Sequence, residues 1–217
     1  MNHLELNYLV NESVSVYQHP DHFRINTDTR LLAEFLELKR NLSILDIGTN
    51  NAALLVYCDR FEPEKLIGVE VLSEACKVAQ INAKHFISHD CEIINDKVQN
   101  IDIEPVDLII SNPPYFPIDH TNPNTNMDMR QLGRVEVNLT LEELVYHAAR
   151  LLKPNGHFCF VHRPDRLNEI YQQLIKNGFS ISRLQIAYDK NDVAKTILID
   201  AKIHSSCQCK ILPPITI

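Results

Sequence analysis

Residues 43–71 read SILDIGTNNAALLVYCDRFEPEKLIGVEV, and this stretch decides the fold of the chain. Two short runs rich in isoleucine, leucine and valine, Ser43–Gly48 and Leu66–Val71, flank a helical pattern over Ala52–Arg60. Strands that are apolar throughout are typical of a parallel sheet covered on both faces. Parallel neighbours also need a crossover connection, which is usually a helix. The stretch therefore predicts a strand, a helix and a second, parallel strand.

The same alternation continues outward along the chain. Further strands are expected over Cys91–Ile94, Val106–Ile110, Phe158–Val161, Ile181–Ala187 and Thr196–Ile203. Helices are expected after Ser73 as a cap, over Thr140–Leu152 behind a capping box, and over Asp165–Lys176 up to Asn177-Gly178. No helix separates the last two strands, so they should pair antiparallel. The prediction is an α/β, Rossmann-like, seven-stranded and mainly parallel sheet with a C-terminal antiparallel strand pair and helices on both faces.

Composition limits the class of protein. The length of 217 residues favours one domain over residues 1–217. The chain shows no signal peptide and no apolar stretch long enough for a membrane, so we expect a cytoplasmic protein whose six cysteines are free thiols. Cys207 and Cys209, with His204 nearby, lack a familiar zinc spacing, so we expect no metal. A net charge of -7 argues against holding nucleic acid by charge alone.

Acidic residues follow three successive predicted strands, at the sheet edge where open α/β sheets bind ligands. A tight turn after Asp46 lets backbone N–H groups approach an anionic group, and Glu70 can accept hydrogen bonds from ribose hydroxyls. Asp96 can meet an adenine amine, although each of the three is alone equally compatible with an ordinary turn. Together they predict a site for an adenosine with a charged tail, lined by Asp46, Gly48, Asn50, Glu70, Val71, Asp96 and Lys97. The glycine-rich dinucleotide fingerprint and the Walker sequence are absent from the sequence, so NAD and ATP fit less well.

The most specific signal is Asn112-Pro113-Pro114-Tyr115, directly after the fourth strand. Each proline fixes its own φ and restricts the residue before it, which makes a rigid extended wedge. The Asn112 side-chain carbonyl and the Pro113 backbone carbonyl can then accept both hydrogens of one NH2 group. Such a nitrogen is a poor nucleophile, because its lone pair is delocalised, and two acceptors favour the positive charge that develops on it. The ring of Tyr115 can stack on a planar substrate.

With these residues the chain resembles the class I S-adenosylmethionine-dependent amino-methyltransferases that carry an Asn-Pro-Pro-Tyr motif. It is most similar to the bacterial tRNA (adenine-N6)-methyltransferases that act on valine tRNA beside the anticodon. The similar segments are Tyr17–Thr29, Arg134–Glu136, Leu151–Gly156, His162–Leu167 and Leu212–Ile215. The resemblance implies a catalytic core over residues 41–217, preceded by an N-terminal segment and cofactor-side helix over residues 1–40.

The resemblance also implies S-adenosylmethionine as the cofactor and tRNA as the partner, with no membrane and no metal. Thr27 and Asp28 would touch the methionine end of the cofactor, and Asn112 would border it as well. A tRNA substrate would present a flipped adenine beside Tyr115. Contacts to the RNA backbone would come from basic residues, for which the candidates are Arg130, Arg134, Arg163 and Arg166.

Two departures from the family keep other functions open. The family usually has glycine at the positions of Asn50 and Ala52. Asparagine tolerates left-handed backbone, whereas Ala52 is expected to add a methyl group beside the cofactor. A non-catalytic RNA-binding protein with a decayed cofactor site is therefore one alternative. A glutamine methyltransferase acting on release factors is another, although such enzymes usually carry a helical domain for which the residues ahead of Asp46 are too few. A DNA adenine methyltransferase is disfavoured, because no target-recognition domain is present.

Overall fold

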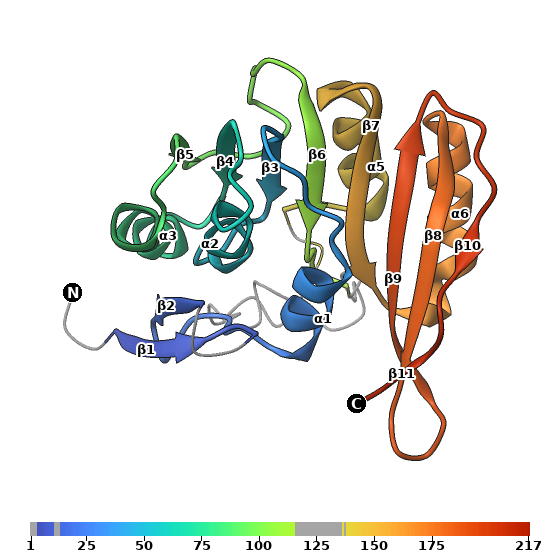
Figure 1. Ribbon diagram of the computed structural model, residues 1–217, viewed down its shortest axis with the longest axis horizontal. Helices are drawn as coiled ribbons and strands as arrows, with labels where there is room; N and C mark the ends of the chain where they lie inside the picture. The colour runs from blue at the N-terminus through green and yellow to red at the C-terminus, as the bar shows by residue number, and fades with distance from the viewer. Residues whose placement is uncertain (1–3, 11–13, 116–135, 137) are drawn as a thin grey trace.

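The fold is organised around one large sheet, whose strands lie side by side in Figure 1 from β5 on the left to β8 and β10 on the right. The computed structural model describes residues 4–10, 14–115, 136 and 138–217. The sheet has the spatial order β10-β8-β9-β7-β6-β3-β4-β5, and β11 also pairs with β8. Its strands are β3 Ser43–Ile47, β4 Lys65–Val69, β5 Cys91–Ile94, β6 Val106–Ser111, β7 Leu152–His162, β8 Phe179–Tyr188, β9 Ala194–Ile203, β10 Lys210–Ile211 and β11 Ile215–Thr216.

The predicted strand directions are confirmed. Strands β7, β6, β3, β4 and β5 pair in parallel, and β9 pairs antiparallel with both β7 and β8. Within the described residues the sheet has nine strands rather than seven, because the two-residue strands β10 and β11 extend its edge at β8. A separate hairpin, β1 Glu5–Tyr8 with β2 Ser15–Gln18, was not predicted. The strands β1 and β2 mix polar with apolar residues, as Glu-Leu-Asn-Tyr and Ser-Val-Tyr-Gln, and lack the apolar run that marked the buried strands.

Helices cover both faces of the sheet (Figure 1). They are α1 Thr27–Phe35, α2 Ala53–Asp59, α3 Ser73–Phe86, α5 Leu141–Leu151 and α6 Leu167–Lys176, with a 3-10 turn over Pro164–Arg166. Residues of α1, α2 and α3 share one core cluster, and residues of α5 and α6 share the other. In β3, Ile44 joins the first cluster while Leu45 and Ile47 join the second. Both faces of β3 are thus buried, which explains its uninterrupted apolar sequence.

Helix termini follow the sequence signals with one exception. The capping box of Thr140 and Glu143 is present at the start of α5, and Gly178 adopts a φ of +81° after α6. The predicted Ser73 cap is wrong, since Ser73 is the first residue of α3 and the N-cap is Leu72, which makes no side-chain cap hydrogen bond. The backbone N–H of Leu72 donates instead to Glu70 Oε1 at 2.8 Å. The carboxylate at the end of β4 therefore takes part of the capping role.

Candidate functional site

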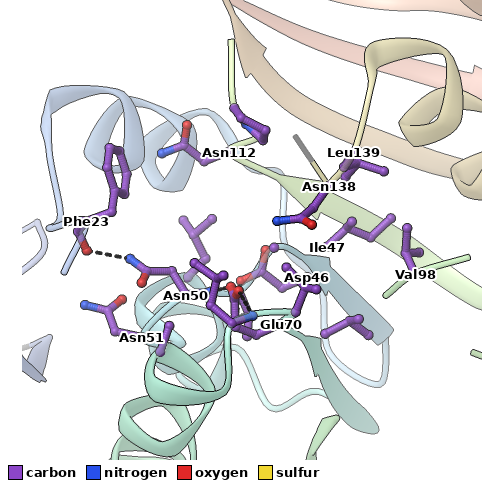
Figure 2. A pocket seen from close by; sticks show the side chains of 18 of the residues that line it. Phe23, Asp46, Ile47, Asn50, Asn51, Glu70, Val98, Asn112, Asn138 and Leu139 are labelled. Carbon is purple, nitrogen blue, oxygen red and sulfur yellow. Dashed lines mark hydrogen bonds between the residues drawn. The ribbon is translucent and has the colours of Figure 1, made fainter. Parts of the chain in front are cut away.

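A pocket opens at the carboxyl ends of the central strands and encloses about 1070 Å³, the open solvent at its mouth included. Its lining combines apolar side chains with a few polar groups, which is typical of a site for a small ligand. Of the residues predicted from the sequence, the pocket is lined by Asp46, Gly48, Asn50, Glu70, Val71, Asp96, Lys97, Asn112 and Pro114. Figure 2 shows the Asn112 side chain across the pocket from the Asp46 and Glu70 carboxylates.

Asp46 places a carboxylate at the buried floor of the pocket. It belongs to the apolar strand β3 and is 1% exposed. Its Oδ2 accepts a hydrogen bond from Thr49 Oγ1 at 2.8 Å, whereas Oδ1 is buried with no hydrogen-bond partner among the described residues. Burial raises the pKa of Asp46 to about 7, with the Thr49 hydrogen bond opposing the rise and the nearby Glu70 carboxylate adding to it. An acceptor without a partner in this position suits a cationic ligand group.

Glu70 and the turn after β3 hold each other in place. Glu70 Oε2 accepts from the backbone N–H of Asn50 at 2.9 Å, and Asn50 Nδ2 donates to the carbonyl of Phe23 at 2.8 Å (Figure 2). Asn50 has a φ of 50°, a left-handed geometry that asparagine tolerates better than other non-glycine residues. Burial raises the pKa of Glu70, against the opposing hydrogen bonds from backbone N–H groups. The turn is therefore formed without glycine at this position.

Ala52 does not crowd the pocket. It also has a left-handed φ of 62°, but its side chain is fully buried in the core cluster of α1 and α2, and it does not line the pocket. The expected methyl group beside the cofactor is thus directed into the protein interior. The departure at position 52 changes core packing rather than the pocket wall.

Asp96 stands at the exposed rim of the same pocket. Its Oδ1 accepts from Asn100 Nδ2 at 2.7 Å and from the backbone N–H of Lys97 at 2.6 Å. The hydrogen bond from Asn100, followed by that from the Lys97 backbone, lowers the pKa of Asp96. Asn95 Nδ2 also donates to the Glu70 carbonyl at 2.7 Å, which ties the end of β5 to the end of β4. The rim carboxylate is therefore ionised and fixed in place.

The Asn112 side chain is held from two sides. Its Nδ2 donates to Thr29 Oγ1 at 3.0 Å, and its Oδ1 accepts a short hydrogen bond from the Tyr115 hydroxyl. Tyr115 is 8% exposed and packs edge-on against His162, with 5.3 Å between the ring centroids. Burial raises the pKa of the Tyr115 hydroxyl. Neither Tyr115 nor Pro113 lines the pocket, so stacking of Tyr115 on a substrate requires the ring to turn outward from this position.

Arg166 forms a hydrogen bond with the backbone of the Asn112–Tyr115 motif. Its Nη1 donates to the Tyr115 carbonyl at 3.0 Å and to Glu136, and its remaining N–H groups pair with Glu169. The Arg166 side chain is 13% exposed, so little of it remains for an RNA phosphate. Burial, with the nearby Arg166 charge, lowers the pKa of His162 to about 4, which keeps the ring against Tyr115 neutral.

Among the other basic residues predicted for RNA contact, the structure describes Arg163. Arg163 is partly exposed, and its backbone N–H donates to His162 Nδ1 at 2.8 Å. Arg130 and Arg134 lie outside the described residues. Among the described residues, the Arg163 guanidinium thus remains a candidate for contact with an RNA phosphate.

The first turn of α1 meets the pocket one residue later than predicted. The described residues that line the pocket include Thr29 but neither Thr27 nor Asp28. Asp28 Oδ1 instead accepts from Thr196 Oγ1 of β9 at 2.6 Å, and the same carboxylate lies beside the Tyr115 hydroxyl, whose pKa it helps burial to raise. A helix turns by about 100° per residue, and the two neighbours therefore face different elements.

Several pocket residues carry no strand-end signal. They are His22, Phe23, Ile25, Thr29, Thr49, Asn51, Val98, Gln99, Asn138 and Leu139. The similarity of Tyr17–Thr29 to the family points to the first four of these. Asn138 is brought to the pocket by tertiary structure, since its carbonyl accepts from Gln99 Nε2 at 3.2 Å. No local pattern could have identified that pair.

Among the residues that the structure describes, no cluster of three or more His, Cys, Asp or Glu side chains is arranged to hold a metal ion. In the same part of the chain, no helix has the length and apolar character needed to cross a membrane. All six cysteines belong to the described residues and are free thiols.

Comparisons with known proteins place this chain among methyltransferases. The family model of the methyltransferase small domain matches residues 10–193. A tRNA1(Val) (adenine(37)-N6)-methyltransferase from Porphyromonas gingivalis is 30% identical over 159 residues, which are 68% of this chain and 61% of that protein. A protein of the same name from Tolumonas auensis is 32% identical over 164 residues, 74% of this chain and 68% of that protein. The match thus spans roughly two thirds of the length of these relatives.

The fold comparison agrees. The crystal structure of the M. jannaschii tRNA m1G37 methyltransferase superimposes with a TM-score of 0.70 at 12% sequence identity, over 94% of this chain and 55% of that one. Likeness at such low identity establishes the α/β fold and its sheet order, and no more.

Proposed function

We propose that this chain, which belongs to the methyltransferase small domain family, transfers a methyl group from S-adenosylmethionine to the N6 amine of an adenosine in tRNA. The target nucleotide lies next to the anticodon, and valine tRNA is the expected substrate, as the names of the relatives suggest. A tRNA substrate implies a cytoplasmic protein. Residues 1–217 would form one catalytic domain. The observation that carries the proposal is the Asn112 amide at a pocket whose floor holds two buried carboxylates.

The hydrogen-bond acceptors of the pocket fit the cofactor. The unpartnered Asp46 Oδ1 suits the ammonium of the methionine tail. Each carboxylate oxygen of Glu70 accepts from one backbone N–H, which leaves further lone pairs for hydrogen bonds from the ribose hydroxyls. Asp96, ionised at the rim, suits the adenine amine. S-adenosylmethionine supplies a methyl group on a sulfonium sulfur that leaves as a neutral sulfide. The protein contributes placement and a field of fixed acceptors.

Asn112 would act on the substrate amine. Its Oδ1 and the Pro113 carbonyl accept the two hydrogens of the amine, which localises the nitrogen lone pair and stabilises the charge that develops on the nitrogen. The Tyr115 hydroxyl now donates to the same oxygen. An incoming amine therefore replaces one hydrogen bond with another, and the oxygen is never left without a donor. Displacement of the hydroxyl also frees the Tyr115 ring to stack on the base.

The RNA interface must work against the net charge of -7. A flipped base contributes stacking and hydrogen bonds that do not depend on charge. Arg163 is the described candidate for a phosphate contact, while Arg166 is retained by Glu136 and Glu169. The affinity for tRNA should therefore fall only gently with salt, in proportion to the few phosphates that are neutralised.

The test is transfer of a labelled methyl group to unmodified bulk tRNA, with purified release factors offered in parallel. Nuclease mapping should locate the label in N6-methyladenosine beside the valine anticodon. Asn112→Ala should lower the rate of labelling at least about a hundredfold, and Asn191→Ala, in an exposed turn, should leave it unchanged. Label in release factor alone would indicate that the same Asn-Pro-Pro-Tyr motif acts on a glutamine side chain of that protein. Absence of transfer together with absence of cofactor binding would identify a decayed site.

A further inference from the structure

A chain of hydrogen bonds links the start of helix α1 to the Asn112 amide. Asn26 is the N-cap of α1, and its Oδ1 accepts from the backbone N–H of Thr29 at 3.0 Å. The same oxygen accepts from Thr29 Oγ1, also at 3.0 Å. Thr29 Oγ1 in turn accepts from Asn112 Nδ2 at 3.0 Å. Thr29 is 7% exposed, so water does not readily replace these partners.

The direction of every bond in this chain follows from its first member. A backbone N–H can only donate, so the Asn26 side chain must turn its oxygen toward Thr29. That oxygen also takes the only hydroxyl proton of Thr29. The Thr29 oxygen is left with lone pairs alone to offer Asn112, and it therefore selects the NH2 end of the amide. The carbonyl end of Asn112 must then face the other way.

The second neighbour of Asn112 makes no such selection. The Tyr115 hydroxyl also lies beside the Asp28 carboxylate, so it can donate either to the Asn112 carbonyl or to Asp28, and in the second case it can accept from an NH2 group. A substrate amine does discriminate, because it needs an acceptor and would be opposed by a second NH2 group. The orientation of the amide must therefore be set from the Thr29 side before the substrate arrives.

We infer that Thr29, oriented by the Asn26 cap of α1, is a positioning residue that fixes the carbonyl of Asn112 toward the substrate amine. The inference rests on the proposed role of Asn112 as an acceptor. It assigns to the helix cap a purpose beyond starting the helix, since the same oxygen that caps α1 sets the polarity of the motif at the end of β6. Thr29 acts entirely through Asn112.

Paired variants test this in the full chain. Thr29→Val keeps the shape of the side chain and removes the hydroxyl, whereas Thr29→Ser keeps the hydroxyl. The single-turnover rate of methyl transfer at saturating S-adenosylmethionine and tRNA should fall about tenfold in the valine variant, the cost of one oriented hydrogen bond. The serine variant should recover most of that loss. The dissociation constant for S-adenosylmethionine should stay within about twofold in both variants.

A double-mutant cycle separates positioning from a direct contact with the cofactor. In an Asn112→Ala background, Thr29→Val should slow the reaction no further, because the residue through which Thr29 acts is gone. An equal slowing in both backgrounds, or a loss confined to cofactor affinity, would overturn the inference. Either result would leave the proposed function standing, since that depends on the wild-type reaction.

A spectroscopic measurement tests the same point without any activity. In ¹⁵N-labelled protein, the Asn112 side-chain NH2 signals are identified by their absence in Asn112→Ala. They should exchange slowly with solvent in the wild-type and Thr29→Ser proteins and rapidly in Thr29→Val. Unchanged protection in Thr29→Val would refute the hydrogen-bond chain, whatever the substrate of the enzyme proves to be.

Discussion

Replacement of Asp46 by asparagine should raise the free energy of unfolding relative to that of the wild type progressively as the pH rises. Burial raises the pKa of Asp46 from an ordinary value of 3.8 to about 7. The folded state thus holds a proton that the unfolded chain has already released between these two values. The free energy of unfolding therefore falls as pH rises through this window, and the loss is complete above about pH 7. Asparagine does not titrate, so its curve lacks this fall.

The expected size follows from the same value. Each pH unit in the window is worth about 1.4 kcal/mol, so between pH 5 and pH 8 the variant should gain about 3 kcal/mol relative to the wild type. For a chain of this length that corresponds to roughly 6 to 12 °C in the midpoint of thermal unfolding. Any constant cost of burying the asparagine NH2 group is the same at both pH values and cancels in the comparison.

The assay is chemical denaturation of the ligand-free wild type and Asp46→Asn across pH 5 to 8. Asp96→Asn is a matched control, because Asp96 is exposed and its pKa is lowered, so both states are ionised throughout this range. Its stability difference from the wild type should stay flat with pH. Parallel curves for Asp46→Asn and the wild type would refute the description of Asp46 as a buried, protonatable floor of the pocket.

Three further results are expected from variants of the site. Asn112→Ala should bind S-adenosylmethionine normally by calorimetry and lose at least about a hundredfold in transfer rate, whereas near-normal turnover would remove the wedge from the mechanism. Glu70→Ala should weaken cofactor binding about tenfold or more, and an unchanged dissociation constant would place it outside the site. Glu136→Gln, which alters the buried partner of the Arg166 guanidinium, should lower the free energy of unfolding by about 1–3 kcal/mol and slow transfer. Glu169 is 47% exposed, so Glu169→Gln should cost less than about 1 kcal/mol in urea denaturation. Equal losses in the two variants would contradict the difference in burial.

The affinity for S-adenosylmethionine should also depend on pH if Asp46 receives the ammonium. Only the ionised carboxylate attracts a cation, so wild-type binding should weaken about tenfold for each pH unit below about 7. Asp46→Asn should bind weakly at every pH and show no such slope. A wild-type affinity that is constant from pH 5 to pH 8 would show that Asp46 does not bind the ammonium.

Residues whose role depends on strand periodicity could be predicted from the sequence. Asp46 and Glu70 end strands whose apolar runs are unmistakable, and both line the pocket. The capping box at Thr140 carries its own local signal in the same way. Ser73 carried a similar signal and was predicted wrongly, because the backbone N–H of Cys76 donates to the Leu72 carbonyl and the helix therefore already includes Ser73. A capping residue type in the sequence thus locates the start of a helix only to within about one residue.

The residues that the sequence did not reveal act through contacts between distant segments. Thr29 and Asn112 are separated by 83 positions in the sequence, and a threonine in a first helical turn has no signature of its own. Arg166 looked like a basic surface residue until the structure placed the Tyr115 carbonyl and Glu136 against it. In both cases the prolines of the motif fix the backbone, while the orientation of its polar groups is imposed from α1 on one side and from the 3-10 turn after β7 on the other. The tetrapeptide by itself therefore specifies which atoms are available for the chemistry, and its neighbours decide which of them face the substrate.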